Sequence, residues 1–310
     1  MNIAYFEPFS RAWSRMKIAL FKPFDLHKWF IIGFSAFLAR LTEGPRSSGS
    51  SGWRGDTSFS EFLGLPNKAW EWLMSHPGWF IGIVFIGMFI IILGVILIWL
   101  SSRGTFMFLD NVVHDKAEIA KPWKRYSMEG NSLFLWRLVF ILICTILFTS
   151  YIIFFFTTAS HLYNGSYNER VPVFLIVVMS FLFILTAIVI GFISTFLNSF
   201  VAPIMYKKNI KATQAWSRFL SLFKRYPFHF ILYGLLLFML AILSLIFIAI
   251  AGLLTCCVGF LLLIIPYIGT VITLPIWYTF RAFSLEFLAQ FDPEYELFPP
   301  SGESSASAPA

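Results

Sequence analysis

Long stretches without a single charged residue constrain this chain more than any other feature of its sequence. Asp, Glu, Lys and Arg are absent from residues 77–102, 138–168, 171–206 and 226–280. A helix needs about 20 apolar residues to cross the hydrocarbon core of a bilayer, and each of these stretches is longer than that. The sequence therefore predicts an all-α, polytopic membrane protein.

Six apolar runs are expected to form the transmembrane helices. The first run is the shortest, and a helix of its length rises only about 25 Å, so a re-entrant segment is an alternative to a crossing there. The last charge-free stretch is too long for one crossing, and Gly252 to Gly259 supply a turn between two. The runs are approximately 26–42, 78–100, 135–160, 172–197, 228–251 and 258–284.

Basic residues gather in every second segment between the runs, which predicts an orientation. Segments 1–28, 101–134 and 207–227 hold 5, 5 and 6 Lys or Arg, whereas 43–77, 161–171 and 252–258 hold 3, 1 and 0. The positive-inside rule makes the rich segments cytoplasmic, together with both termini. A re-entrant first run would move residues 101–134 to the outer face, which the charge distribution argues against.

Composition excludes some classes of function. The net charge of +7 comes from Lys and Arg beside apolar runs, which indicates anionic lipid headgroups as partners rather than nucleic acid. The three cysteines have no metal-binding or redox spacing. No small-residue cleavage site follows the first run, so it is read as a retained helix and not as a signal peptide.

A short motif recurs before two of the apolar runs. Ala12-Trp13-Ser14-Arg15 is repeated as Ala215-Trp216-Ser217-Arg218, and a proline follows each copy before the run begins. On a helical wheel the Trp and the positions three and seven residues later share one face. We expect cytoplasmic amphipathic helices, one of them over residues 1–25, in units that repeat two or three times; the alternative is that any cytoplasmic loop entering a membrane is basic and aromatic.

Outside the membrane domain of residues 26–290 the expected soluble parts are small. Ser58 and Glu61 form a capping-box pattern that predicts a short outer helix to about Met74. Residues 291–310 are rich in Ser, Pro and acidic residues, which predicts a disordered cytoplasmic tail.

No constellation of residues predicts catalysis, a cofactor or a metal site. The sequence lacks the P-loop, dinucleotide-binding and zinc-protease motifs, and no two histidines are three or four residues apart. Asp110, His114, Asp115 and Glu118 form the densest polar group, and solvated helix charges explain it better than a metal site does. We therefore expect no enzyme activity.

Two sets of residues are candidates for binding. Prolines and polar residues in the fourth and sixth runs mark a candidate substrate path, because broken helices at membrane depth often line such paths, although helix packing uses the same residues. The path residues are Asn198, Pro203, Pro266 and Pro275. The candidate contacts to lipid headgroups are Arg11, Arg15, Lys22, Arg218 and Arg225.

Several motifs carry a resemblance to known proteins. They include Arg103-Gly104, Phe108-Leu109-Asp110-Asn111, Gly130-Asn131-Ser132, residues 200–206, and the segment from Ile265 to Phe291. Together they resemble uncharacterised bacterial multi-pass membrane proteins, which are distantly similar to the membrane domain attached to some glycerophosphodiester phosphodiesterases. The resemblance implies a bacterial inner membrane. It carries over no activity, since the catalytic domain of those enzymes has no counterpart here.

These observations favour a non-enzymatic membrane protein that acts as a scaffold, an assembly factor or a lipid-associated accessory protein. A transporter or lipid-moving permease with a path along the fourth and sixth runs is the alternative. A membrane-embedded lipid enzyme is third.

Overall fold

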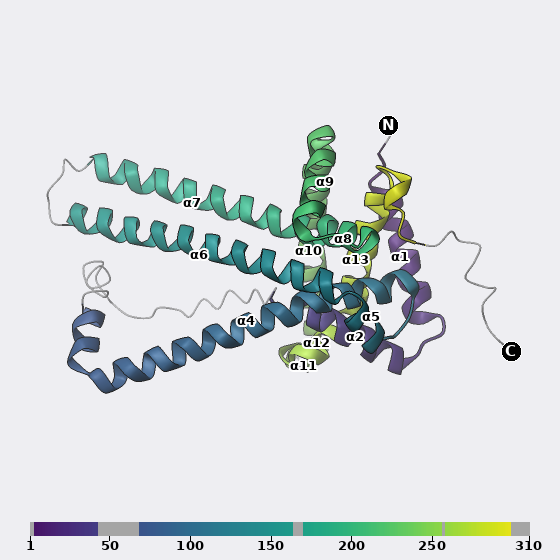
Figure 1. The fold of residues 1–310 in the computed structure, drawn as a ribbon, viewed down its shortest axis with the longest axis horizontal. Helices are drawn as coiled ribbons and strands as arrows, with labels where there is room; N and C mark the ends of the chain where they lie inside the picture. Colours follow the sequence, from purple (N-terminus) through teal and green to yellow (C-terminus); the bar gives the residue numbers. More distant parts are fainter. Residues whose placement is uncertain (1–2, 43–67, 164–169, 256–257, 299–310) are drawn as a thin grey trace. The chain divides into compact units, whose positions relative to one another are not determined.

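The computed structural model describes residues 3–42, 68–163, 170–255 and 258–298 (Figure 1). The all-α prediction is confirmed: within these ranges every regular element is a helix or a helical turn. The long helices are α4 (Pro77–His114), α6 (Ser127–Tyr163), α7 (Arg170–Phe196) and α10 (Pro227–Leu254). The others are α1 (Phe6–Phe21), α2 (Leu26–Arg40), α5 (Ala120–Arg125), α8 (Ala202–Lys208), α9 (Ala212–Arg225), α11 (Val258–Ile264), α12 (Pro266–Ile272), α13 (Leu274–Ala289), the π-helix η1 (Leu197–Val201) and the 3₁₀ turn η2 (Pro293–Tyr295).

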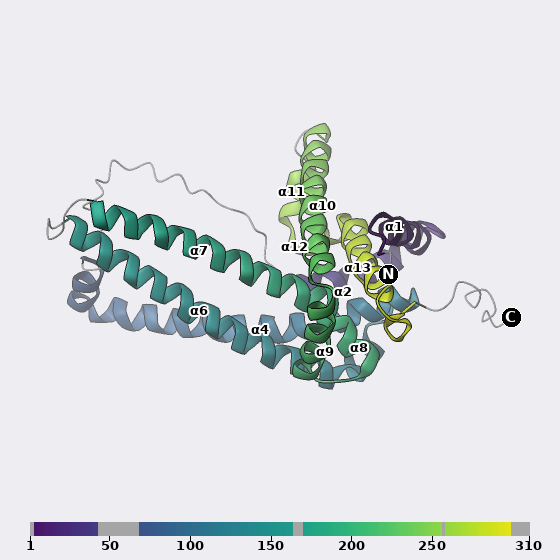
Figure 2. The same cartoon turned by 90° about the horizontal axis from the view of Figure 1, so that it is seen from above.

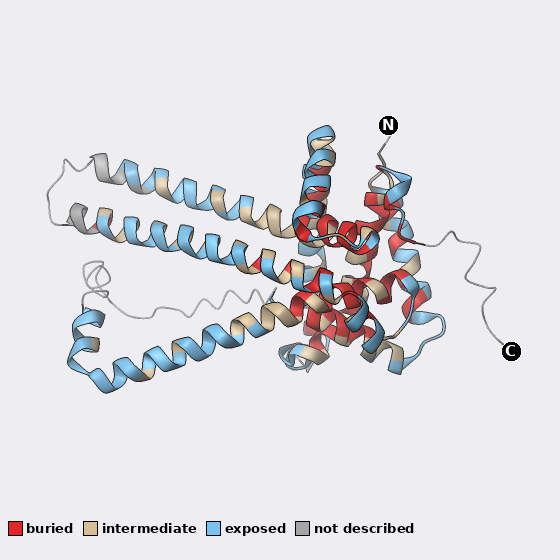
Figure 3. Ribbon diagram, in the orientation of Figure 1, coloured by how far each residue is buried: buried red, intermediate tan, exposed pale blue. Residues whose placement is uncertain are grey.

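Four helices are long and apolar enough to cross a membrane. They comprise Pro77–His114, Ser127–Ala159, Val177–Lys208 and Pro227–Leu254, the third continuing from α7 through η1 into α8. Their most apolar windows are almost entirely unburied by the rest of the protein, as the pale blue of α6 and α7 in Figure 3 shows. Apolar surface of this extent is stable only against another apolar medium, so the chain has the character of an integral membrane protein.

The other two apolar runs take different forms. The first run forms α2, a helix of 15 residues, which is shorter than the usual crossing length. The sixth run is divided into α11, α12 and α13 by breaks at Ile265 and Thr273, each followed by a proline in the first turn of the next helix. Proline has no N–H to donate and favours the first turn, so each proline starts a new helix. A continuous helix over 258–284 is thus not formed.

The chain divides into two units. The first comprises residues 1–42, 98–136 and 194–310, and the second comprises residues 43–97 and 137–193. In the second unit α6 and α7 lie side by side in both views (Figures 1 and 2). Tyr151 and Thr186 join them through a hydroxyl contact of 3.1 Å, and the Phe148 and Phe183 rings pack at 5.3 Å between centroids.

An aromatic cluster forms the core of the first unit. The Tyr233 ring of α10 lies 4.6 Å from Phe287 of α13 and 4.8 Å from Phe200 of η1, and Phe200 stacks on Phe219 of α9 at 5.5 Å. All four side chains are fully buried. This cluster fixes α9, α10 and α13 around η1.

The α2 helix packs antiparallel to the C-terminal end of α4. Ser101 Oγ donates to the Ala39 carbonyl at 2.8 Å, Asn111 Nδ2 donates to Ser35 Oγ at 3.4 Å, and Lys28 pairs with Asp115 at 2.9 Å. Gly104 permits this approach, because a Cβ there would lie 2.6 Å from Leu38 Cβ. On its other side α2 packs against α12, where the Tyr267 hydroxyl donates to the Phe30 carbonyl at 2.9 Å.

The two copies of the repeated motif bury matching positions. Ala12 and Met16 in α1 correspond to Ala215 and Phe219 in α9, and all four are at most 1% exposed. Trp13 is 42% exposed, because the buried stripe of α1 is centred on Ala12 and Met16.

The chain after α13 departs from the predicted disorder of residues 291–310. Its described part, residues 291–298, packs on the first unit: Tyr295, Leu297 and Phe298 are buried, and Lys207 Nζ donates to the Glu296 carbonyl at 2.7 Å. The apolar residues in this segment supply the burial that its acidic composition did not suggest. The Ser58–Glu61 pattern lies outside the described residues, whereas residues 68–75 are helical.

Candidate functional site

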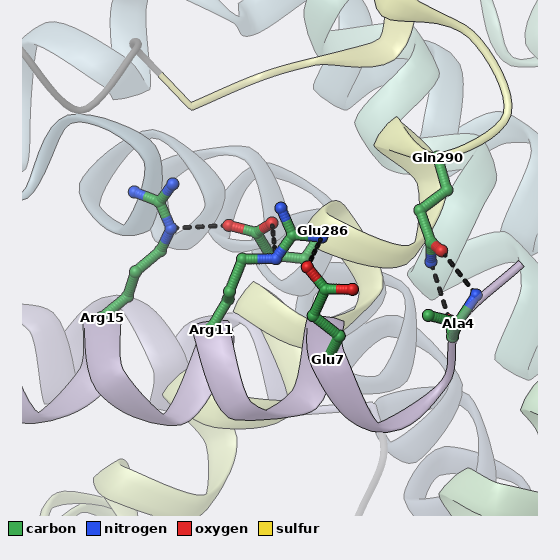
Figure 4. Close-up of polar contacts among 6 residues, drawn as sticks. All are labelled: Ala4, Glu7, Arg11, Arg15, Glu286 and Gln290. Carbon is green, nitrogen blue, oxygen red and sulfur yellow. Dashed lines mark hydrogen bonds and ion pairs between the residues drawn. The ribbon is translucent and has the colours of Figure 1, made fainter.

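Two of the predicted headgroup residues bind a carboxylate of the protein itself. Glu286 of α13 points toward α1, and its side chain is only 7% exposed (Figure 4). Arg15 Nε donates to Glu286 Oε1 at 2.6 Å, and Arg11 Nε lies 3.6 Å from Oε2. A charge-assisted contact of this length is stronger than a neutral hydrogen bond. The structure therefore assigns Arg11 and Arg15 to holding α1 on α13.

Further contacts fix the same pair of helices. The Gln290 side chain bonds both to the N–H and to the carbonyl of Ala4, at 2.9 and 3.0 Å (Figure 4). The Arg15 guanidinium also lies 4.0 Å from the centre of the Phe298 ring. The contacts lie along one side of α1, so this helix is part of the packed unit and does not stand apart from it.

The other three predicted headgroup residues are exposed. Lys22 follows the end of α1, while Arg218 and Arg225 lie on α9. Among the described residues none of the three has a carboxylate within ion-pair distance. Arg225 lies 5.5 Å above the Tyr226 ring. These cations are free to meet an external anion.

The Asp110 region is a buried hydrogen-bonded cluster. The hydroxyls of Tyr206 and Tyr126 both donate to Asp110 Oδ1, at 2.7 and 3.2 Å, and His114 Nδ1 lies 3.2 Å from the same oxygen. Burial raises the pKa of Tyr126, so its phenol stays protonated and able to donate. The Asp110 side chain is 15% exposed, so the expectation of a solvated helix charge is wrong for this residue.

The other acidic residues of the predicted polar group, Asp115 and Glu118, form ion pairs outside the Asp110 cluster. Glu118 pairs with Lys121 at 3.0 Å rather than with His114, and Asp115 pairs with Lys28. Within the described residues no group of three His, Cys, Asp or Glu side chains is placed to hold a metal ion. The Asp110 cluster thus joins α4, the residue between α5 and α6, and α8 through hydrogen bonds.

The candidate path residues lie in four different helical elements. Asn198 lies in the π-helix η1, and its carbonyl accepts a hydrogen bond of 2.6 Å from Arg281 Nη1 of α13. Pro203 is buried in α8. Pro266 is exposed at the start of α12, and Pro275 opens α13. Pro266 and Pro275 therefore break the sixth run, while Asn198 marks a local change in helical winding.

Sequence reasoning missed Glu286, Tyr126 and Tyr206. Glu286 lies 271 residues from Arg15 along the chain, and Tyr206 lies 96 residues from Asp110. Tyr206 and Glu286 lie within the motif segments 200–206 and 265–291, but a motif does not show which distant charge a side chain meets. A single carboxylate among apolar residues of α13 was the one available signal.

The family of the chain follows from comparison with known sequences. Residues 4–272 match a family described as a family of unknown function (DUF7544). The chain belongs to this family. No curated protein and no solved structure matches it.

Membership agrees with the expected resemblance to an uncharacterised family, whereas the matches include no link to glycerophosphodiester phosphodiesterases. The matched region contains Arg11, Arg15 and the Asp110 cluster. It ends before Glu286, so one half of the α1–α13 contact lies beyond it.

Proposed function

We propose that this protein is a non-enzymatic, multi-pass protein of a bacterial inner membrane with a lipid-associated accessory or assembly role. Its partners on this proposal are membrane lipids, and its cytoplasmic basic surface contacts anionic headgroups. The resemblance to bacterial membrane domains and the four long apolar helices support the location. The observation that carries the proposed role is the arrangement of α9.

The α9 helix presents a basic surface that its packing holds in place. Ala212, Ala215 and Phe219 are buried in the first unit. The opposite side exposes cations and small polar residues: Ser217, Arg218, Ser221, Lys224 and Arg225. The apolar α10 begins two residues after Arg225, at Pro227. A basic helix directly before an apolar helix is suited to headgroup contact. Each Lys or Arg near an anionic membrane surface contributes about 1 kcal/mol of binding free energy.

The proposed topology has six crossings with both termini cytoplasmic. All three basic-rich segments, 1–28, 101–134 and 207–227, belong to the first unit. These segments also contact one another directly: Lys28 pairs with Asp115 at 2.9 Å, and the Ala212 N–H donates to Ser132 Oγ at 3.0 Å. On this proposal the three segments share one side of the membrane, so an even number of crossings separates any two of them. If α4 crosses once, the chain between Lys28 and α4 must supply a second crossing, which the proposal assigns to the first run.

A re-entrant first run is the alternative topology. One observation supports it: α2 packs against the end of α4 that carries Arg103 and Asp110, and not against the charge-free part of α4 that is expected to cross the membrane. Yet it would place Lys28 and Asp115 on opposite sides of the bilayer, although they form an ion pair of 2.9 Å. This contact supports the six-crossing proposal.

The headgroup proposal is tested on the full chain. The apparent melting temperature should rise more with phosphatidylglycerol than with phosphatidylcholine, since only the former adds a net negative headgroup. Arg218→Gln and Arg225→Gln should each reduce this difference, and the double variant should largely remove it. Lys116→Gln is the matched control, because Lys116 is exposed and lies away from α9. An unchanged difference in the double variant would refute the proposal.

A transporter is the second candidate. The π-helix at Asn198 and the breaks in the sixth run favour it, because π-turns and discontinuous helices are frequent at functional sites. Asn198→Leu should then abolish movement of a solute while insertion into the membrane is unchanged. Unaltered flux of every solute tested would remove this candidate.

A further inference from the structure

Arg103 lies in an aromatic cage at the boundary of the charge-free part of α4. It is the first charged residue after residues 77–102. Its guanidinium carbon is 4.8 Å from the centre of the Trp99 ring and 5.3 Å from that of Trp123, which belongs to α5. The two indoles meet edge to face, with ring centroids 5.8 Å apart. Both rings thus bracket one cation.

The aliphatic part of the Arg103 side chain packs against α6. A Cβ at Gly130 would lie 2.9 Å from Arg103 Cγ, so the absence of a side chain at this position lets the stem lie directly on α6. Asn131 is the next residue, and its side chain points to the guanidinium. Gly130 and Asn131 therefore fix the position of the Arg103 side chain.

The cage contains more hydrogen-bond donors than acceptors. Arg103 Nε and Nη2 both donate to Asn131 Oδ1 at 3.3 Å, and Trp99 Nε1 donates to the same oxygen at 3.1 Å. A guanidinium has five N–H groups, and one amide oxygen has two lone pairs. Over the described part of the chain no carboxylate lies within 4.0 Å of Arg103. The site has a full positive charge and unused donors, which is the chemistry of an anion site.

The depth of the cage indicates which anion it meets. The charge-free part of α4 ends one residue before Arg103, and the charge-free part of α6 begins at Leu138, seven residues after Asn131. Tryptophan indoles favour the headgroup level of a bilayer. On the proposed membrane location, this level is rich in phosphate esters, and Arg binds phosphate through paired N–H groups.

We propose that the cage of Trp99, Arg103, Trp123 and Asn131 binds the phosphate group of a membrane phospholipid. The open N–H groups of Arg103 donate to the phosphate oxygens, while the indole faces pack against the glycerol and the upper acyl chains. The inference rests on the proposed membrane location but not on the basic surface of α9. It assigns one bound phospholipid to a defined site, whereas α9 provides only general attraction to anionic headgroups.

Phosphatidylglycerol retained by the full chain is the readout. The detergent-purified protein is titrated with phosphatidylglycerol, and bound lipid is counted by native mass spectrometry. Arg103→Gln should weaken binding of the tightest lipid about tenfold, since charge-assisted hydrogen bonds are lost. Arg103→Lys keeps the positive charge but loses the paired N–H donors of the guanidinium, so we expect a loss of lipid affinity smaller than that of Arg103→Gln. Lys116→Gln is the matched control and should bind as the wild type does.

Asn131→Asp provides a test that leaves the cage intact. The new carboxylate has the shape of the amide and pairs with Arg103, so the variant should fold normally and still lose the lipid. Wild-type retention in both Arg103→Gln and Asn131→Asp would overturn the proposal. Displacement of the lipid by excess inorganic phosphate would also overturn it, by showing a site for a soluble anion. If the Arg103 variants lose the tight lipid but keep the phosphatidylglycerol-dependent rise in melting temperature, the cage acts independently of the α9 surface. If only Arg218→Gln and Arg225→Gln lose the tight lipid, the cage proposal is contradicted.

Discussion

At the scale of single residues, distant polar partners decide how the first unit is held together. Glu286 meets two arginines of α1, and Asp110 meets Tyr126, which follows α5, and Tyr206 of α8. Each carboxylate is mostly buried and accepts hydrogen bonds from other elements. Burying a charge costs free energy unless it is paired, so these partners are needed wherever the carboxylates occur. Exposed cations such as Arg218 are the ones that the proposed headgroup contact uses.

Replacing Glu286 tests this division of roles. Glu286→Gln leaves Arg11 and Arg15 without their carboxylate, but both arginines are partly exposed and water compensates for some of the loss. We expect a destabilisation of about 1–2 kcal/mol, measured as a lower apparent melting temperature in detergent. Glu7→Gln is the control: Glu7 is 69% exposed and pairs with Arg11 within α1, so its effect should stay below about 0.5 kcal/mol. Equal effects of the two variants would contradict the role of Glu286.

At the scale of elements, the same helix serves two environments. The first part of α4 exposes apolar side chains, whereas its end from Ser101 to Val113 is mostly buried against other helices. The glycines of α4 reflect this change. Gly94 has no atom within 4 Å of an added Cβ, while at Gly104 the Cβ would lie 2.7 Å from the backbone nitrogen of Ala39. Only the second glycine is required by packing.

A pair of alanine substitutions distinguishes these positions. Gly104→Ala forces α2 away from α4 and should destabilise the protein by about 1–3 kcal/mol, the usual cost of overpacking. Gly94→Ala adds a better helix former in open space and should be neutral or stabilising by up to about 1 kcal/mol. Thermal unfolding of both variants in the same detergent measures the contrast. A neutral Gly104→Ala would show that α2 is not packed on α4 as described.

At the scale of the whole molecule, the sequence predicted the helical class and the four long apolar helices, because each charge-free stretch exceeds the length of a crossing. It also flagged Pro266 and Pro275, where the sixth run breaks. The partners of Arg11 and Arg15 were not predictable: a helical wheel shows which face is basic but not which buried carboxylate, 271 residues away, will meet it. The ordered segment to Phe298 was missed because acidic and Pro-rich composition outweighed three apolar residues.

The arrangement of crossings is the last prediction, and it belongs to the whole chain. Single cysteines near residues 50, 115, 165 and 217 in a background without the native cysteines report the side of the membrane through labelling in intact cells. Asp115 and Ser217 belong to the first unit and are exposed, so both should be labelled only after the cells are opened.

Since α6 leaves this unit as an apolar helix, position 165 should be labelled from outside. The first run then decides the sides of positions 50 and 115, which the crossing by α4 separates. A crossing by the first run places 50 outside and 115 inside, whereas a re-entrant segment places 50 inside and 115 outside. Because Lys28 at the start of the first run pairs with Asp115, we expect labelling from outside at 50. Labelling of 115 and 165 from the same side would contradict a crossing by α6 and with it the six-crossing topology.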